Sequence, residues 1–325
     1  MRNILYYPCI NLPNTDWTIR ALLYYDRIGS IAPAQYFEEP ECFDPFMRDV
    51  VRNELIEPMD PMMHLEHPTE VSEEICEYLK RNAHIIKRRK LSLKTEKSRL
   101  HVDKFNPEIL TELTRMGVAE RVDWNWYNVE RKTANELMML LASVVANKID
   151  YLPATDEMNY DFSFPYIRNE SLELRMRQYR RDLILKNLIP YPKQIDLTRL
   201  RHFKDRHSDL LKAFGNKVEQ LVFNPNIEHD SYLFELMLMD MKNSKDELCA
   251  KMNESHMGDI VLGSICGSVS AVIGFLSGSV LGVPGLLNTI YSACKIERPE
   301  NVSDQTGLKY LALVDKRLRR KNEGD

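Results

Sequence analysis

The sequence predicts a helix-rich α+β fold, in which a small α/β region spans residues 1–165 and a mostly helical region spans residues 166–325. Three observations support this class. A β-type run, an amphipathic run and a second β-type run follow one another within the first 32 residues. Beyond residue 165, apolar side chains recur mainly at helical spacing. Finally, an uncharged, glycine-rich segment over 260–294 predicts an apolar helical hairpin.

Length and composition are those of a globular protein. The 325 residues are 44% hydrophobic and 28% charged, which excludes a disordered chain and fits two domains of about 100–200 residues. Twelve glycines, 16 prolines and six cysteines exclude collagen-like, low-complexity and disulfide-scaffold classes. Because no two cysteines form a C-x-x-C pair and no secretory signal is recognisable, we expect reduced thiols in a cytoplasmic protein.

The N-terminal region is predicted to open with a β-α-β unit. Residues 4–9 form a β-type run, and residues 27–32 form another. Between them, Thr15 is suited to cap a helix that continues to Asp26 and presents apolar residues on one face. Strands joined by a helical crossover pair in parallel, so the sequence predicts a small, partly parallel sheet.

Prolines organise the next segment. Helices are predicted over 43–53 and 69–81, with a loop between them because three prolines interrupt it. Residues 87–100 are expected to form an exposed connector or a sheet edge. Asn106 followed by proline is typical of a helix start, and Gly117 is typical of a left-handed helix end.

Alternation and periodicity predict the later elements. Val122, Trp124 and Trp126 alternate with polar residues and predict a half-buried strand. Thr133 is suited to cap a helix with a wide apolar face. Three helices are expected in the C-terminal region, the second being one long amphipathic helix, and a last strand or helix follows them. These elements span 170–188, 197–223, 231–252 and 308–314.

The most unusual feature is the segment 260–294, which contains no charged residue in 35 positions. Several of its glycines recur at helical spacing on one face, where missing side chains let two backbones approach closely. These candidate helix-association residues are Gly263, Gly267, Gly274, Gly278 and Gly282. Residues 260–281 are long enough to cross a membrane, whereas their glycines and serines also fit a buried hairpin in a soluble domain. The sequence leaves both alternatives open.

Charge is distributed unevenly along the N-terminal region. Residues 37–78 carry thirteen acidic residues and two arginines, whereas residues 87–104 carry eight basic residues and two acidic ones. Such segments pair with one another or are solvated, and a basic run can alternatively bind phosphate groups. The phosphate-binding candidates are Lys87, Arg88, Arg89 and Lys90. No aromatic residue interrupts this run, which argues against single-stranded nucleic acid as the ligand.

No familiar catalytic motif stands in the sequence. The G-x-S-x-G elbow, the Walker A loop, G-x-G-x-x-G and H-E-x-x-H are missing, and no cofactor or metal is implied. His64 and His67 lie three apart in a proline-rich loop, which does not suit a zinc site on one helix face. The candidate catalytic residues are polar groups near predicted strand ends, namely Asp26, His101, Asp103 and Asp156. In a strand, His101 and Asp103 would share one face.

Several blocks of the sequence carry a family resemblance. The most specific is Leu5-Tyr6-Tyr7-Pro8, followed by Trp17, the run ALLYYDRI over 21–28 and Pro33. Looser blocks lie at 141–156 and 189–214. These residues resemble an uncharacterised bacterial protein family known as a domain of unknown function, with Tyr25 where tryptophan is expected. The resemblance covers most of the chain and implies a bacterial, cytosolic protein, but no activity and no catalytic residues.

The lack of catalytic motifs and the glycine stripe together favour an interaction or effector-type protein. In this hypothesis the segment 260–294 mediates helix association with a protein partner, a second copy or a membrane during a stress or defence response. The alternative is a soluble enzyme or nucleic-acid-processing protein whose site lies at the N-terminal strand ends. A third alternative is a structural subunit of a complex. We expect a cytoplasmic protein, with membrane association if the segment inserts.

Overall fold

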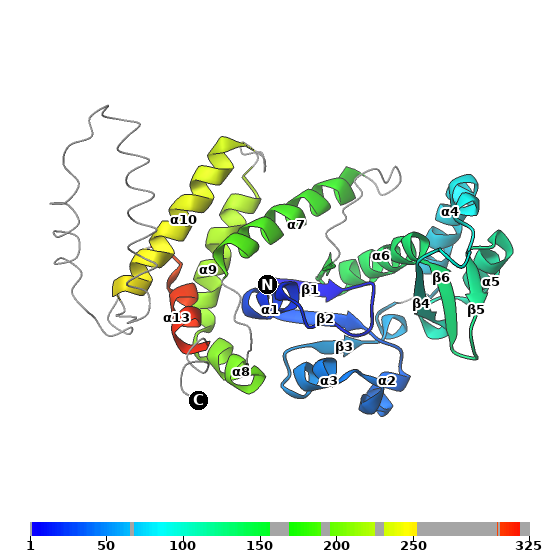
Figure 1. Ribbon diagram of the computed structural model, residues 1–325, viewed down its shortest axis with the longest axis horizontal. Helices are drawn as coiled ribbons and strands as arrows, with labels where there is room; N and C mark the ends of the chain where they lie inside the picture. The colour runs from blue at the N-terminus through cyan, green and yellow to red at the C-terminus, as the bar shows by residue number, and fades with distance from the viewer. Residues whose placement is uncertain are drawn as a thin grey trace. The chain divides into compact units, whose positions relative to one another are not determined.

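The computed structural model describes residues 2–65, 68–156, 169–189, 196–224, 231–251, 304 and 306–318. The chain divides into two compact units, Met1–Leu172 and Glu173–Asp325 (Figure 1). The first unit holds two small sheets with helices, and the described part of the second unit is helical. The predicted helix-rich α+β class is therefore confirmed. The boundary predicted at residue 165 and the glycine-rich segment 260–294 lie outside the described residues.

The first sheet is the predicted β-α-β unit, extended by two strands. β1 (Asn3–Tyr6), α1 (Asp16–Tyr24) and β2 (Arg27–Ile31) follow in chain order, and β1 pairs with β2 in parallel. β3 (Glu57–Met59) pairs with β2, and β7 (Leu152–Ala154) pairs with β1, both also in parallel. The order β3-β2-β1-β7 places all four carboxyl ends at one edge of the sheet.

Both outer strands of this sheet contain a proline in their middle. Pro58 lies in β3 opposite Ser30, and Pro153 lies in β7 opposite Leu5. Proline cannot donate a backbone hydrogen bond, so a sheet tolerates it in an outer strand, which has a neighbour on one side only. The prediction of a loop around Pro58 is therefore wrong. The proline lies in an edge strand, where its missing N–H is tolerated.

α1 starts where the sequence predicts, but for a different reason. Thr15 occupies the N-cap position, yet its side chain makes no capping hydrogen bond. The helix instead buries most of its length, including Trp17, Leu22 and Leu23. A nine-residue helix is marginal by itself, so tertiary packing stabilises it.

The acidic segment folds into short helical pieces. α2 (Gln35–Glu38) and the 3₁₀ turn η1 (Pro40–Cys42) precede α3 (Pro45–Arg52), which matches the helix predicted there. Asp44 caps α3, because its Oδ1 accepts a hydrogen bond from the Met47 N–H at 2.7 Å.

The next helix is longer than predicted. A 3₁₀ turn, η2 (Pro61–His64), comes before α4 (Pro68–Ile86), and α4 continues directly into the 3₁₀ turn η3 (Lys87–Arg89). Ile86 is fully buried at the end of α4. The basic run therefore begins as the end of a packed helix and not as a free connector.

The second sheet of this unit is antiparallel. β4 (Lys97–His101) and β5 (Ala119–Arg121) both pair with β6 (Trp126–Glu130), in the order β4-β6-β5. Between β4 and β5 the chain forms the 3₁₀ turn η4 (Val102–Lys104) and the helix α5 (Pro107–Met116). The end of the segment predicted as a connector or edge is thus an outer strand of this sheet.

Both ends of α5 confirm their predictions. At the start, Asn106 Oδ1 accepts a hydrogen bond from the Glu108 N–H at 3.0 Å. At the end, Gly117 has φ 77° and ψ 20°, the left-handed conformation that glycine adopts without a steric penalty. These interactions involve near neighbours in sequence, and so the sequence alone could reveal them.

The predicted strand through Val122 and Trp124 is wrong in its first part. β6 starts at Trp126, and the preceding residues form the turn of the β5–β6 hairpin, in which Trp124 is 84% exposed. Asp123 builds this turn, because its Oδ1 accepts hydrogen bonds from the N–H groups of Asn125 and Trp126, both at 2.9 Å. This local bonding favours a turn over the extended backbone that the alternation suggested.

One helix, α6 (Arg131–Lys148), connects the two sheets (Figure 1). It packs against β1 and β7 of the parallel sheet and against β4 and β6 of the antiparallel sheet. Its cap is Glu130 and not Thr133 as predicted. The Glu130 carboxylate accepts hydrogen bonds from the N–H groups of Lys132 and Thr133 and from the Thr133 hydroxyl at 2.6 Å. Thr133 thus lies inside the first turn as a donor to the cap.

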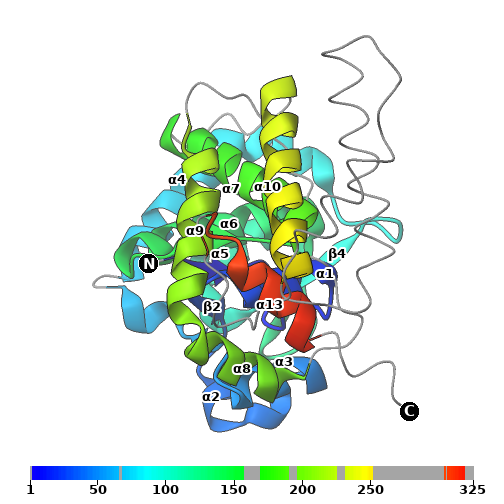
Figure 2. The same ribbon diagram turned by 90° about the vertical axis from the view of Figure 1, so that its left-hand side faces the viewer.

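The second unit begins within α7 (Asn169–Leu188). α7 and α10 (Tyr232–Lys251) match two of the predicted helices, and the element predicted as a strand or helix is the helix α13 (Lys309–Leu318). In this unit α13 packs against both α9 and α10 (Figure 2). Tyr310 of α13 is fully buried in the resulting core.

The single helix predicted over 197–223 is two helices. α8 (Leu197–Arg206) and α9 (Ser208–Val222) meet at His207, which leaves helical geometry with φ −116° and ψ 28°. Apolar spacing continues across the break, and neither proline nor glycine marks it, so periodicity alone predicts one helix.

Helix contacts in the second unit combine aromatic packing with one buried ion pair. The Tyr310 ring stacks on the Phe214 ring, with 6.1 Å between the ring centroids, and its centroid lies 5.4 Å from that of Phe203. The buried Arg181 guanidinium donates two hydrogen bonds to the Glu219 carboxylate, both at 2.7 Å. Among the described helices, none is long and apolar enough to cross a membrane.

Candidate functional site

The carboxyl edge of the parallel sheet holds a well-defined polar pair. Asp156 follows β7 by two residues, and Tyr6 is the last residue of β1. The Tyr6 hydroxyl donates a hydrogen bond to Asp156 Oδ1 at 2.8 Å. The Tyr6 side chain is buried, and its ring centroid lies 5.6 Å from that of Trp17, so the hydroxyl is held in place. Open α/β sheets bind their ligands at this edge.

Asp26 lies at the opposite edge of the same sheet. It precedes β2 and accepts hydrogen bonds from Arg2, from the backbone N–H at 2.9 Å and from the guanidinium at 3.0 Å. The strands are parallel, and a four-residue strand spans about 13 Å. Asp26 is therefore separated from Asp156, although the sequence placed both at strand ends, and its role is to fasten the first strand.

His101 and Asp103 are neighbours, but they do not share a strand face as predicted. β4 ends at His101, and Asp103 lies in η4 with 53% of its side chain exposed. The His101 ring is buried against Trp126, and its Nδ1 accepts a hydrogen bond from the Asp103 N–H at 3.3 Å. Burial lowers the pKa of His101, so the ring is neutral at pH 7. The hydrogen bond to Nδ1 assigns the ring hydrogen to Nε2.

Lys104 is a site residue that the sequence analysis missed. It ends η4, only 2% of its surface is exposed, and among the described residues it has no hydrogen-bond or ion-pair partner. Burial lowers the pKa of Lys104 to about 8, and the charge of a Cys9 thiolate would act in the opposite direction. In the sequence Lys104 looks like another member of a solvated basic run. Its spacing of three from His101 is the signal that could have singled it out.

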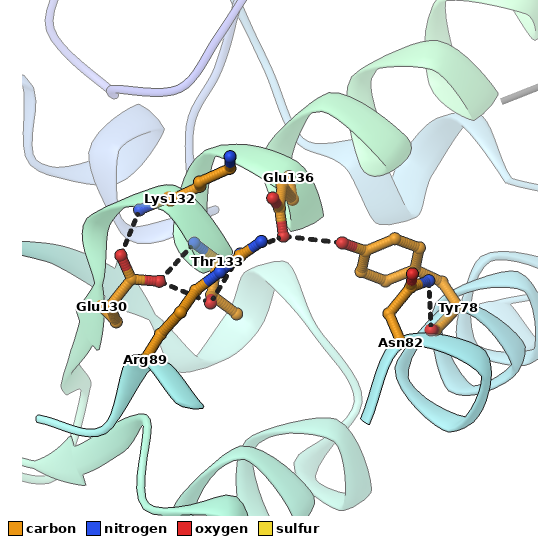
Figure 3. A network of polar contacts seen from close by, with 7 residues as sticks. All are labelled: Tyr78, Asn82, Arg89, Glu130, Lys132, Thr133 and Glu136. Atoms are coloured by element: carbon orange, nitrogen blue, oxygen red, sulfur yellow. Dashed lines mark hydrogen bonds and ion pairs between the residues drawn. The ribbon is translucent and has the colours of Figure 1, made fainter. Parts of the chain in front are cut away.

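The basic run contains one structural residue and three exposed ones. Arg89 donates a hydrogen bond from its guanidinium to Glu136 Oε2 at 2.8 Å (Figure 3). The Glu136 side chain, on α6, is 3% exposed. Lys87, Arg88 and Lys90 are exposed. Of the four phosphate-binding candidates, Arg89 is thus already engaged by a carboxylate of the protein.

The same carboxylate accepts a second hydrogen bond, from the Tyr78 hydroxyl of α4 at 2.6 Å (Figure 3). Burial and the charge of Glu136 raise the pKa of Tyr78 far above its ordinary value, so this hydroxyl remains a donor. Burial opposes the charge of Arg89, but the hydrogen bond and charge of Glu136 outweigh it and raise the pKa of Arg89. This network joins α4 and η3 to α6 and is structural in character.

The remaining sequence candidates are placed as follows. The five glycines of the helix-association stripe and His67 of the histidine pair lie outside the described residues. Within the described residues, no group of three or more His, Cys, Asp or Glu side chains is arranged to hold a metal ion. The described polar groups that could take part in binding or catalysis are therefore those near the carboxyl edge of the parallel sheet and in η4.

Because comparison with known proteins finds no relative, a function has to be argued from the chemistry of these residues. No family model, curated protein or solved structure matches this chain.

Proposed function

We propose that this chain is an interaction or effector-type protein, of the kind used in bacterial stress or defence responses, that associates through the segment 260–294. The observation that carries the proposal is the run of 35 uncharged residues with glycines at helical spacing. The described helices on either side support it, since α10 before the segment packs against α13 after it. The chain thus leaves and re-enters one packed helical unit, so association through the segment would act directly on that unit.

A bulky substitution in the glycine stripe tests this proposal. Gly278→Leu places a large side chain where two helices would have to approach, so we expect the assembly to dissociate. Ser277→Leu adds the same side chain one position away and is the matched control, with assembly retained. Light scattering after size-exclusion chromatography measures the assembly. Equal masses for wild type and Gly278→Leu would contradict association through this stripe.

Cell fractionation distinguishes a membrane from a protein as the partner of the segment. An alkaline carbonate wash removes peripheral proteins from membranes but leaves inserted ones. If the full chain stays in the washed membranes, the segment associates within a bilayer. If it is recovered in the soluble fraction as an assembly, the partner is a protein or a second copy of the chain.

A second candidate function is favoured by the hydrogen bond between Tyr6 and Asp156 at the ligand-binding edge of the sheet. It is that of a soluble enzyme or nucleic-acid-processing protein. If nucleic acid is the substrate, neutralising Lys87, Arg88 and Lys90 together should weaken binding and reduce its salt dependence. Arg89 should be kept, because its loss would disturb the fold. Binding that is absent from wild type, or insensitive to salt, would contradict the nucleic-acid form.

A further inference from the structure

Two hydrogen-bond donors on neighbouring side chains of the N-terminal unit have no acceptor among the described residues. The first is the ammonium group of Lys104, a residue that is 2% exposed and has no hydrogen bond or ion pair with any described residue. The second is His101 Nε2, which is buried and has no hydrogen-bond partner in the described part of the chain. His101 Nδ1 already accepts a hydrogen bond from Asp103, so Nε2 carries the hydrogen of the neutral ring. An unsatisfied buried donor is costly, and most proteins avoid it.

The two donors are close to one another. His101 and Lys104 are three residues apart across the single turn of η4, a spacing that puts side chains on the same side of a 3₁₀ turn. Lys104 also influences the titration of His101 electrostatically, as expected for neighbours. Cys9, three residues beyond the end of β1, acts on Lys104 in the same way. Lys104 therefore lies near the loop that follows β1.

We propose that His101 and Lys104 form a binding subsite for the oxyanion of a small molecule, either a phosphate group or a carboxylate. Two donors with one positive charge match an anion that offers several acceptor oxygens. A metal ion is not favoured here, because the described residues contain no group of three or more His, Cys, Asp or Glu side chains arranged to hold one. The exposed Asp103 carboxylate lies on the Nδ1 side of the ring, 3.5 Å from Nδ1, and so leaves Nε2 available.

This subsite does not depend on the glycine-rich segment. The subsite would anchor a ligand for the second candidate function, the soluble enzyme, and it therefore rests on that proposed function. The test measures binding directly. Anion binding can therefore be absent while an activity at Tyr6 and Asp156 is present, and anion binding can be present without that activity.

Equilibrium dialysis of the full chain with radiolabelled inorganic phosphate tests the subsite, in a buffer free of other oxyanions. We expect one site in wild type. Lys104→Met should weaken binding by about tenfold or more, because it removes a charge-assisted hydrogen bond. His101→Leu should weaken it by a smaller factor. Lys80→Met is the matched control, since it removes an exposed lysine of α4 that lies outside the basic run and should leave binding unchanged.

Acetate in the same dialysis identifies the preferred oxyanion. Displacement of phosphate by acetate at similar concentrations would indicate a carboxylate ligand, and failure to displace it would indicate a phosphate group. The proposal is overturned if wild type binds neither anion up to about 10 mM. It is equally overturned if Lys104→Met binds phosphate like wild type, or if Lys80→Met alone loses it. Tryptophan fluorescence of each variant verifies that the unit remains folded.

Discussion

Replacing Lys104 with methionine should stabilise the N-terminal unit at neutral pH. The side chain is almost completely buried and has no hydrogen-bond or ion-pair partner among the described residues, so its charge is held in an unfavourable environment. Methionine has a similar length and no charge, and so it should fill the same space without leaving a cavity. A substitution that improves stability at a conspicuous polar position is typical of a residue kept for function.

The magnitude follows from the pKa of Lys104, which is about 8 against an ordinary value of 10.5. At about 1.4 kcal/mol for each tenfold change in proton affinity, burial of the charged form costs about 3 kcal/mol. Since the folded pKa is below the unfolded one, the unfolded chain binds more protons between pH 8 and pH 10.5. The cost is therefore complete below pH 8 and disappears as the pH rises through this window.

Urea denaturation at pH 7 and at pH 10.5 measures the effect, in a buffer without phosphate or carboxylate. The chain's three tryptophans, Trp17, Trp124 and Trp126, all lie in the N-terminal unit, so tryptophan fluorescence reports on its unfolding. Lys104→Met should gain about 3 kcal/mol at pH 7 and little at pH 10.5. The exposed Lys87→Met should change little at either pH. If Lys104→Met destabilises the unit at pH 7, the amine has a partner and the reasoning fails.

Three further substitutions test the contacts that hold each unit together. Arg89→Met leaves the buried Glu136 carboxylate without its ion pair and should lower the free energy of unfolding in urea by about 3 kcal/mol. The control Lys87→Met should lower it by less than about 0.5 kcal/mol. Equal effects would show that the ion pair is solvated. Glu130→Ala removes the cap of α6 and should cost about 1 kcal/mol by the same assay, and no loss would mean that the cap contributes nothing. Gly307 has φ 74°, and a Cβ atom there would lie 3.0 Å from the Ala213 carbonyl oxygen, so Gly307→Ala should cost about 1–3 kcal/mol. Circular dichroism during thermal unfolding measures this last change, and an unchanged melting temperature would contradict it.

Helix ends show how far sequence reasoning reaches. Asn106 and Gly117 bound α5 as predicted, because each acts on backbone groups within a few residues. Thr133 was the expected cap of α6, yet Glu130, three residues earlier, fills that role. Both residue types can accept a hydrogen bond from a backbone N–H, and the pairing of Glu130 in β6 decides where the helix can begin.

Interruptions are harder to predict than elements. His207 divides a predicted helix although the apolar spacing continues through it. Pro58 suggested a loop, but it stands inside an outer strand, as Pro153 does in the other outer strand. A proline has the same sequence signal in a loop and at a sheet edge. Which of the two applies depends on whether another strand lies on its free side.

By itself, the sequence determined the α+β class, the parallel β-α-β opening, most helices and the ends of α5, since these depend on periodicity and on bonds between near neighbours. The tertiary structure decided which charged residues are buried. Arg89 and Lys104 belong to one basic stretch, yet Arg89 meets a buried carboxylate of α6, and Lys104 is enclosed with no acceptor among the described residues. It also placed Asp26 and Asp156 at opposite edges of one sheet. Burial and electrostatic partnership depend on surfaces contributed by segments far apart in the chain, and packing alone brings these together.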